Sequence, residues 1–330
     1  MNHSRITGWG KYIPEKCLSN LDIEKFVNTG HDWIVSRTGI EQRYIANDDE
    51  NCSMMAVKAI EKSLEQANRS ASDLDLIIVA TNTPDYLVPS VSSIIQHNLG
   101  ANCPAFTVVT GCTGFMYALI TAHQFLATGA YSCISIVGVD TISRFLDWND
   151  RTTCVLFGDG AGAVVLEATN KPYGIISFDM GSDGAKGMQL AIPGFGSAVK
   201  MDHAMLNRGD QFLSMVGSDI FKFATRIVPP TIRKIVDAAD LVLNDIALFV
   251  PHQANIRIIE SATKELVIDK EKIFSNIHHY GNTSAASIPL CLIDIVAQKR
   301  VNIGDYLCLV SFGAGLTWAS AIVRWGTHLD

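Results

Sequence analysis

The chain has 330 residues, of which 48% are hydrophobic and 18% are charged. This composition is typical of a globular protein with a large core, and the length fits two domains or one domain built in two parts. The formal net charge of −7 argues against nucleic acid as the main partner, because neutralising phosphates requires a basic surface.

The chain begins MNHSRITGWGKYIPEK, which contains no apolar run of signal-peptide length. No later stretch offers about 18 consecutive apolar residues free of charge. We therefore expect a cytoplasmic protein that does not insert into a membrane.

The cysteines are scattered singly along the chain, without a C-x-x-C pair, and no histidine cluster has zinc spacing. A chain of this length needs no disulfide framework. The sequence therefore predicts reduced thiols and no metal site. The eight cysteines are Cys17, Cys52, Cys103, Cys112, Cys133, Cys154, Cys291 and Cys308.

Short β-branched runs alternate with longer helical stretches along the chain, which predicts an α/β architecture. Strands are expected where apolar β-branched residues cluster between turn signals. In chain order these segments are 76–81, 106–110, 133–139, 163–166, 246–250 and 306–310.

The segment 108–119, VVTGCTGFMYAL, changes from a β-branched run into a helical pattern at Cys112. The helix that follows is apolar nearly all round, so we expect it to be buried and to end at Gly129. A lone cysteine is most often a small core residue. At a helix N-terminus, however, unpaired N–H groups and the helix dipole favour the thiolate, which makes Cys112 a candidate nucleophile.

A weak internal repeat relates segment 109–138 to segment 279–313. Each segment has a glycine, a polar residue and a threonine before an apolar helix, a turn and a strand. The repeat predicts two halves with one fold, which we divide as 1–173 and 174–330. In this alignment Cys112 falls opposite Asn282.

Two short polar segments in the second half stand next to apolar runs. VPHQANIRI carries His252 just after an expected strand, and HYGNTSAASIP carries Asn282. Alone, a histidine is commonly a surface or core residue and Gly-Asn is commonly a turn. Because all three residues lie at strand or helix ends, where α/β folds gather their sites, Cys112, His252 and Asn282 form a candidate catalytic set.

Five motifs resemble those of the β-ketoacyl-acyl-carrier-protein synthase III family, within the thiolase superfamily. They occur in the family's order and extend over most of the chain. They are GCTGF at 111–115, FGDGAGA at 157–163, PHQANIRI at 251–258, GNTSAASIP at 281–289 and FGAGLTW at 312–318.

The resemblance implies a thiolase-like α/β fold with two pseudo-repeated halves in five layers, and a homodimer. It further implies that Cys112 takes an acyl group from acyl-CoA and passes it to the carbanion formed by decarboxylating malonyl-acyl carrier protein. His252 and Asn282 would stabilise the enolate in this scheme. No metal or organic cofactor is needed for either step.

The oxyanion of the acyl-transfer steps needs backbone donors. The resemblance assigns this role to the N–H of Cys112 and one N–H of the turn after Phe312, at Ala314 or Gly315. Ala314 departs from the all-glycine form common in the family. Since alanine keeps its N–H, we expect a changed turn preference and not a lost donor.

For coenzyme A, the family pattern falls on Trp33, Arg37 and Thr38 in DWIVSRTGI and on Arg151 in DRTT. By resemblance, Trp33 and Arg151 would sandwich the adenine, a role that suits an aromatic ring and a planar guanidinium. Ser218 stands where the family often has an asparagine near the pantetheine.

Lys222 and Arg257 are candidates for contacting the acidic carrier protein. Val88 stands where many acetyl-primed relatives have a bulky aromatic residue that reaches into the acyl pocket of the partner subunit. A valine there predicts that starters longer than acetyl are accepted.

Other members of the superfamily fit less well. A thiolase needs a second reactive cysteine in the last glycine turn, where FGAGLTW has none, and a plant-type polyketide synthase lacks HQANIRI. A hydroxymethylglutaryl-CoA synthase uses a glutamate acid, where this chain offers only Asp85 nearby.

The main alternative is a specialised relative that condenses or transfers an acyl group in secondary metabolism. A papain-like hydrolase and an inactive binding protein are the alternatives outside acyl transfer.

Overall fold

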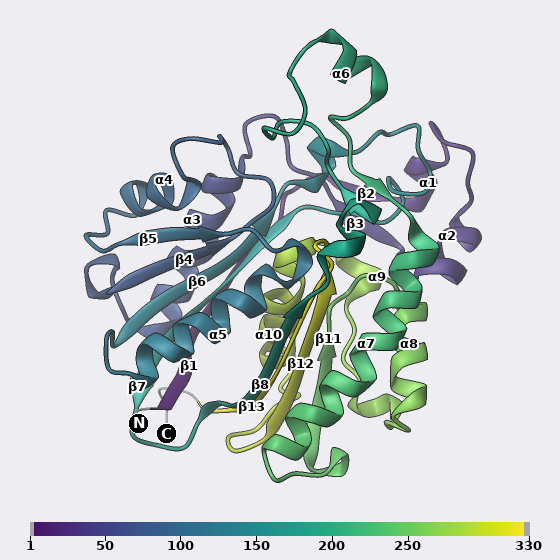
Figure 1. Ribbon diagram of the computed structural model, residues 1–330. Helices are drawn as coiled ribbons and strands as arrows, with labels where there is room; N and C mark the ends of the chain where they lie inside the picture. Colours follow the sequence, from purple (N-terminus) through teal and green to yellow (C-terminus); the bar gives the residue numbers. More distant parts are fainter. Residues whose placement is uncertain (1–2, 327–330) are drawn as a thin grey trace.

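Two mixed β-sheets with the same pairing pattern frame the chain in the computed structural model, which describes residues 3–326 (Figure 1). The first sheet has the order β1 (His3–Tyr12), β7 (Gly160–Thr169), β6 (Cys133–Asp140), β4 (Leu76–Ala80) and β5 (Ala105–Val108). The second has the order β8 (Gly174–Ser182), β13 (Thr317–Arg324), β12 (Tyr306–Gly313) and β11 (Ile246–Pro251).

Each sheet begins with two antiparallel pairings and continues with a parallel one. The prediction of two similar α/β halves is therefore confirmed. The first sheet is built by strands up to Thr169 and the second by strands from Gly174, so the proposed division after residue 173 falls between β7 and β8.

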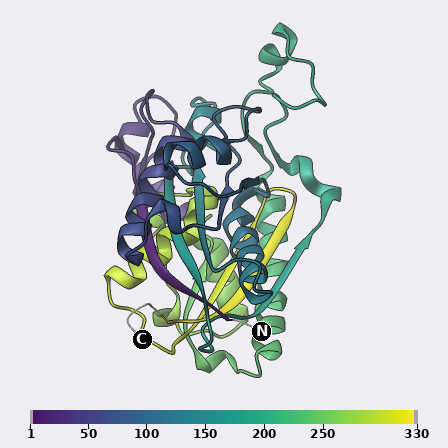
Figure 2. The same ribbon diagram turned by 90° about the vertical axis from the view of Figure 1, so that its left-hand side faces the viewer.

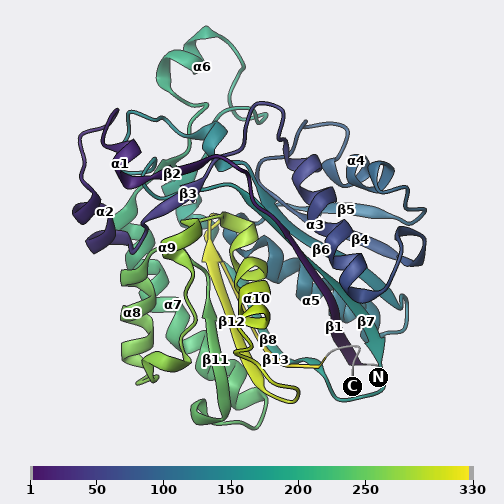
Figure 3. The ribbon, with the colours of Figure 1, turned by 180° about the vertical axis from the view of Figure 1, so that it is seen from behind.

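The long helices complete five layers. Helix α3 (Cys52–Ala67) covers the outer face of the first sheet, and α7 (Gly217–Ala238) covers the outer face of the second. Helices α5 (Gly114–Ala127) and α10 (Ser287–Ala297) lie side by side between the sheets, as Figure 3 shows from behind. These two central helices are apolar on nearly all sides because a sheet packs against each of the two faces of their layer.

The remaining elements are short and lie around this frame. The helices are α1 (Asn20–Ile23), α2 (His31–Thr38), α4 (Val91–Asn98), α6 (His203–Arg208), α8 (Ile256–Glu265) and α9 (Ile277–Tyr280). The strands are β2 (Cys17–Ser19), β3 (Gln42–Tyr44), β9 (Leu190–Ala191) and β10 (Ser214–Met215). Helix α6 lies in a segment that protrudes from the rest of the molecule (Figures 1 and 2).

All six strands expected from the sequence are present, as β4, β5, β6, β7, β11 and β12. Strand β1 was not expected, because glycines interrupt its apolar pattern. A Cβ at Gly8 would lie 2.0 Å from the carbonyl oxygen of Ser63, and one at Gly10 would lie 2.3 Å from that of Ala59. The two glycines thus let α3 pack directly on the strand, a role that weakens the strand pattern.

Helix α5 ends as expected. Gly129 has a φ of 76°, and its N–H donates to the carbonyl of Leu126 while the N–H of Ala130 donates to that of Phe125. This is the Schellman arrangement, in which a left-handed glycine satisfies the last carbonyls of a helix. Within residues 3–326, no helix is long and apolar enough to cross a membrane.

Candidate active site

Cys112 lies in a 3₁₀ turn, η2 (Gly111–Thr113), between β5 and α5. The end of β12 is packed directly against it. The hydroxyl of Ser311 donates to the Cys112 carbonyl at 2.9 Å, and a Cβ at Gly313 would lie 2.7 Å from the Cys112 nitrogen. Only glycine at position 313 permits this approach, so the second half of the chain fixes the backbone of the cysteine in the first.

Two cavities meet at Cys112. The larger has a volume of about 650 Å³ and the smaller about 190 Å³. Cys112, Phe157 and Leu190 line both of them. The thiol therefore stands where a larger and a smaller cavity meet, a position that suits a group that transfers one part of a substrate.

The larger cavity brings together ten of the residues expected from the sequence. They are Trp33, Arg37, Thr38, Cys112, Arg151, Ser218, Lys222, His252, Arg257 and Asn282. Four of these side chains are cationic, and none of the residues that line the cavity in the described part of the chain is an Asp or Glu. Since the whole chain carries a net charge of −7, this concentration of positive charge favours an anionic ligand.

Trp33 and Arg151 are in contact at the entrance. The guanidinium carbon of Arg151 lies 5.2 Å from the centre of the Trp33 ring, a cation–π contact. A hydrogen bond from Arg151 to the carbonyl of Asn28 at 3.2 Å holds the guanidinium in place. The two side chains expected at the adenine are thus in contact with each other.

His252 directly follows β11, and its N–H donates to the carbonyl of Val310 at 2.8 Å. Its ring meets the Phe312 ring edge to face at 5.5 Å. The side chain is buried, and its Nδ1 atom has no hydrogen-bond partner among residues 3–326. Burial lowers the pKa of His252 to about 3, so the imidazole is neutral near pH 7 and has both a donor and an acceptor nitrogen.

Asn282 is held by backbone contacts across the two halves. Its N–H donates to the carbonyl of Leu156 at 2.9 Å, and its carbonyl accepts from the N–H of Gly158 at 3.0 Å. Its side-chain Oδ1 accepts from the N–H of Ser284 at 2.9 Å. The Nδ2 amide makes no hydrogen bond within residues 3–326, so it remains a donor for a ligand in the cavity.

The protonation state of the Cys112 thiol differs from the one expected from the sequence, which was a favoured thiolate. The residue lies in the separate turn before α5, and burial raises the pKa of its thiol to about 12, with a smaller contribution from the Asp140 carboxylate. Burial away from water disfavours the charged form by more than the helix terminus favours it. The thiol is therefore protonated near pH 7, and a base must accept its proton; neutral His252 lines the same cavity.

The residues of the turn after Phe312, which is expected to donate an N–H to the oxyanion, lie at different cavities. Gly313 lines the larger cavity and Ala314 lines the smaller one, whereas Gly315 lines neither. Val88 also lines neither cavity and is 86% exposed. Within one chain, the residue expected at the acyl pocket is therefore on the surface.

The smaller cavity has mainly apolar walls. Four of its residues, Leu190, Ala191, Ile192 and Leu213, flank the protruding segment that carries α6, and Asn82 and Ser284 are its polar members. Neither Asn82 nor Ser284 is among the site residues expected from the sequence. Asn82 follows shortly after β4, much as His252 follows β11, and that position was the available signal.

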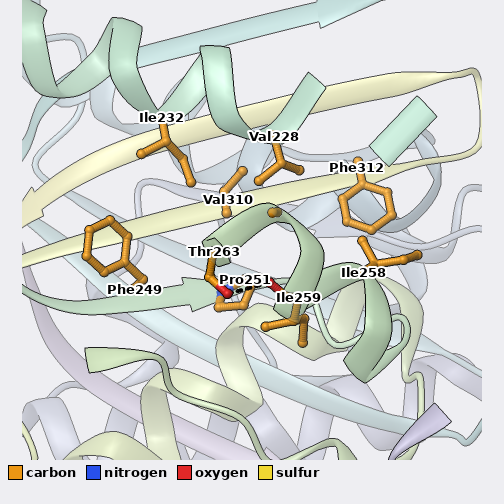
Figure 4. Close-up of a pocket in the computed structure, with 10 residues that line it drawn as sticks. Val228, Ile232, Phe249, Pro251, Ile258, Ile259, Thr263, Val310 and Phe312 are labelled. Carbon is orange, nitrogen blue, oxygen red and sulfur yellow. Dashed lines mark hydrogen bonds between the residues drawn. The ribbon is translucent and has the colours of Figure 1, made fainter. Parts of the chain in front are cut away.

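A third cavity, of about 20 Å³, lies between α7, α8 and the second sheet (Figure 4). Its walls are apolar apart from Thr263, whose hydroxyl donates to the carbonyl of Ile259 at 2.7 Å. A space of this size holds about one water at most. It is a packing gap behind Phe312, away from the thiol.

No disulfide joins the eight cysteines, all of which lie in the described part of the chain. Among residues 3–326 there is also no group of three or more His, Cys, Asp and Glu side chains that could hold a metal ion.

The chain matches the family described as 3-oxoacyl-[acyl-carrier-protein (ACP)] synthase III at residues 106–184, and the C-terminal family of the same name at residues 236–325. It is 44% identical to the β-ketoacyl-[acyl-carrier-protein] synthase III of Desulfitobacterium hafniense strain Y51, over 97% of each chain.

Solved structures agree with this relationship. The β-ketoacyl-[acyl carrier protein] synthase III of Thermus thermophilus is 41% identical with a TM-score of 0.90, covering 98% of this chain and 99% of that one. The priming β-ketosynthase of the R1128 polyketide biosynthetic pathway is 31% identical with a TM-score of 0.90, covering 98% of this chain and 96% of that one. The thiolase-like fold expected from the motifs is confirmed.

The substitution His252→Gln is expected to reduce the loss of stability in mild acid. The pKa of the imidazole is about 3 in the folded chain and 6.5 without burial. As the pH falls below 6.5 the unfolded state binds the proton first, so this group lowers the free energy of unfolding by about 1.4 kcal/mol per pH unit until the folded pKa is reached.

Chemical denaturation of both proteins at about pH 7.5 and about pH 5.5 measures the effect. The drop in the free energy of unfolding should be about 1 kcal/mol smaller for the variant than for the wild type. Equal drops would mean that His252 is not held neutral by burial.

Proposed function

Because the chain belongs to the β-ketoacyl-[acyl-carrier-protein] synthase III family, we propose that it starts fatty-acid synthesis by condensing an acyl group from acyl-CoA with malonyl-acyl carrier protein. It is an acyl-transferring condensing enzyme. The observation that carries the proposal is the position of the Cys112 thiol, where the cation-lined cavity meets the small apolar one.

In the first half-reaction, the sulfur of Cys112 attacks the thioester carbonyl of acyl-CoA. His252 takes the thiol proton as the C–S bond forms, because the thiol itself is protonated and the imidazole is neutral. The N–H of Cys112 and one from the turn at 313–315 hold the tetrahedral oxyanion. Coenzyme A then leaves as a thiolate and takes the proton from His252, which leaves an acyl-cysteine.

In the second half-reaction, malonyl-acyl carrier protein loses carbon dioxide and becomes an enolate. Neutral His252 and the free Nδ2 of Asn282 donate to the enolate oxygen, where the negative charge develops. The enolate carbon attacks the acyl-Cys112 carbonyl, and the C–S bond breaks to give the β-ketoacyl product. A proton from solvent restores the thiol.

The cationic residues at the larger cavity suit both substrates. Coenzyme A carries phosphates and the carrier protein is acidic, so Arg37, Arg151, Lys222 and Arg257 complement each of them. Lys222 is exposed and lies 3.8 Å from Asp219 in a weak surface pair, which leaves it available for a protein partner. We assign Lys222 and Arg257 to the carrier protein, and Trp33, Arg37, Thr38, Arg151 and Ser218 to coenzyme A.

We assign the adenine to Trp33 and Arg151, whose side chains are in cation–π contact, with 5.2 Å between the guanidinium carbon and the centre of the ring. The two side chains would have to separate to admit the base between them.

A second copy of the chain is the proposed partner of the β5 edge. This strand ends the first sheet, and next to it lie four exposed apolar side chains: Tyr86, Leu87, Val88 and Val109. A hydrogen bond of 2.8 Å between Ser90 and Thr107 fixes the loop against β5. An uncovered edge strand beside an apolar patch favours association, and light scattering is expected to give twice the chain mass of 35.9 kDa.

We place the protein in the cytoplasm, since eight unpaired cysteines fit a reducing compartment. A specialised role in secondary metabolism is the second candidate. The likeness to the R1128 priming β-ketosynthase, at 31% identity, supports it. The second candidate differs from the first in its starter acyl group or in the acceptor with which the acyl group is condensed or to which it is transferred.

The proposed function is tested by incubating the protein with an acyl-CoA and malonyl-acyl carrier protein. Carbon dioxide should be released with a β-ketoacyl product, and intact mass after acyl-CoA alone should show one added acyl group. Both should be lost in Cys112→Ala, while Cys154→Ala serves as the control. Acyl labelling that persists in Cys112→Ala would contradict the assignment of the nucleophile.

The side chain of Asn282 is expected to act mainly on the enolate. Asn282→Ala should slow carbon dioxide release about 100- to 1000-fold, the typical loss for one preorganised donor, and slow acyl loading much less. Single-turnover acylation and carbon dioxide release give the two rates separately.

A second variant controls for the contact between Asn282 and Ser284. Asn282→Asp keeps the oxygen that accepts the Ser284 N–H but loses the donor. It should load acyl groups and still fail in decarboxylation. Equal slowing of both steps in both variants would make Asn282 a structural residue.

The starter is expected to be longer than acetyl. Val88 is proposed to reach the acyl cavity of the partner subunit, where a small side chain leaves room for more methylenes at about 0.8 kcal/mol each. Acyl-CoAs of about four to eight carbons should load Cys112 faster than acetyl-CoA. Val88→Phe should shift the preference toward acetyl, and Val242→Phe, on a distant exposed turn, should not. A wild-type preference for acetyl-CoA would exclude this pocket assignment.

A further inference from the structure

A chain of hydrogen bonds runs from a buried carboxylate to the Cys112 sulfur, through Asn82 and Ser284. Asp140, at the end of β6, is fully buried and accepts from the Asn82 amide at 3.0 Å. The same amide donates to the Ser284 hydroxyl at 3.2 Å. That hydroxyl in turn donates to the Cys112 sulfur at 3.5 Å.

The orientation of the Asn82 amide is determined by its partners. Its Oδ1 faces the N–H of Gly111 at 2.9 Å, and a backbone N–H can only donate. Its Nδ2 faces the Asp140 carboxylate, which can only accept. The amide therefore cannot be reversed, and its second N–H must point at the oxygen of Ser284.

The direction of the Ser284 hydroxyl follows from this. Its oxygen accepts from Asn82, so its own hydrogen is free to donate elsewhere. Asp140 is the competing acceptor, but its two oxygens already accept five hydrogen bonds. These come from the Thr81 and Thr83 hydroxyls, the Asn82 amide and the N–H groups of Asn82 and Ala285. The Ser284 hydroxyl also opposes the burial that raises the pKa of Asp140, so this carboxylate is a second acceptor within reach. The acceptor that meets hydrogen-bond distance and angle is the Cys112 sulfur, at 3.5 Å.

The backbone of Ser284 is held in a conformation that few non-glycine residues adopt. Its φ is 50°, in the left-handed region. The Asn282 Oδ1 accepts its N–H at 2.9 Å, which stabilises this turn. Such strain persists where the surrounding contacts determine it, and it is common at functional sites. Here it places the hydroxyl beside the thiol.

We propose that Asn82 is a positioning residue that directs the Ser284 hydroxyl toward Cys112, so that this hydroxyl stabilises the thiolate when His252 removes the proton. The proposal deepens the proposed function. It rests on that function only in naming His252 as the group that accepts the Cys112 proton. The titratable groups around the thiol are the Asp140 carboxyl, from β6, which raises the thiol pKa, and the His252 imidazole, after β11, which lines the same cavity. A charge–assisted hydrogen bond to the thiolate opposes the effect of burial on the same sulfur.

The test measures alkylation of Cys112 by iodoacetamide, followed by mass spectrometry of its peptide, in the absence of substrate. Far below the thiol pKa the rate is proportional to the thiolate fraction. Losing one hydrogen bond to the charged form should raise the pKa by about one unit and lower the rate at a fixed pH about tenfold. Ser284→Ala and Asn82→Ala should each show this loss.

The double variant decides whether Asn82 acts through Ser284. If it does, Asn82→Ala in the Ser284→Ala background should cause no further loss, so the combined effect stays near tenfold. Independent effects would multiply to about a hundredfold and would overturn the proposal. Unchanged alkylation in Asn82→Ala would overturn it as well.

A further variant separates positioning from a structural role. Thr83→Val removes another donor to Asp140 without touching the path to the sulfur, so it should not slow alkylation. A tenfold loss in Thr83→Val, equal to that in Asn82→Ala, would mean that the network only supports the fold.

An effect transmitted through the charge of Asp140 would have the opposite sign. Removing Asn82 takes a donor from this carboxylate and raises its pKa, and a neutral Asp140 favours the thiolate. Faster alkylation in Asn82→Ala would therefore contradict the proposal. Because alkylation needs neither acyl-CoA nor carrier protein, absence of condensing activity in the wild type would refute the proposed function and leave this test intact.

Discussion

The site depends on direct backbone contact between the two halves of the chain around Cys112. A Cβ at Gly313 would lie 2.7 Å from the Cys112 nitrogen, one at Gly111 would lie 2.7 Å from the Ala314 nitrogen, and one at Gly138 would lie 2.2 Å from the Ala285 oxygen. Three glycines thus let loops of one half touch the backbone of the other. Neither half alone can form the site, since the nucleophile belongs to the first and its polar partners to the second.

The same close contact removes water, and the loss of water determines the charge states. Burial raises the pKa of Cys112 to about 12 and lowers that of His252 to about 3. Both residues therefore start neutral, and charge appears only when a substrate is bound. A neutral imidazole can accept the thiol proton in one step and donate to an enolate in the next, which a permanent imidazolium could not do. Under the proposed function, the burial that makes the thiolate costly thus also keeps His252 in the neutral form that both half-reactions require.

The sequence predicted those parts of the fold and the site that follow from local patterns. Apolar β-branched runs located six strands, and the repeat correctly predicted two similar halves. Strand β1 was missed because Gly8 and Gly10 serve the packing of α3, and tertiary contact overrides local propensity there. The prediction of a favoured thiolate at Cys112 was wrong for a similar reason. The cost of desolvating the thiolate depends on all the groups around the thiol, whereas the sequence shows only the helix terminus next to it. The polar path through Asn82 and Ser284 joins residues about 200 positions apart, which single-sequence patterns cannot relate.

The distribution of charge connects the fold with the substrates. A chain with net charge −7 repels acidic partners at long range, so an acidic carrier protein gains from approaching only where the local potential is positive. Arg37, Arg151, Lys222 and Arg257 lie together at the larger cavity although they come from distant parts of the sequence. The fold collects them at the larger cavity beside Cys112, whereas the smaller cavity at the same thiol has no cationic side chain among its lining residues in the described chain. Under the proposed function, phosphates and acidic protein surface are stable at the larger cavity, and an uncharged acyl chain is the part of a substrate that is stable in the smaller one.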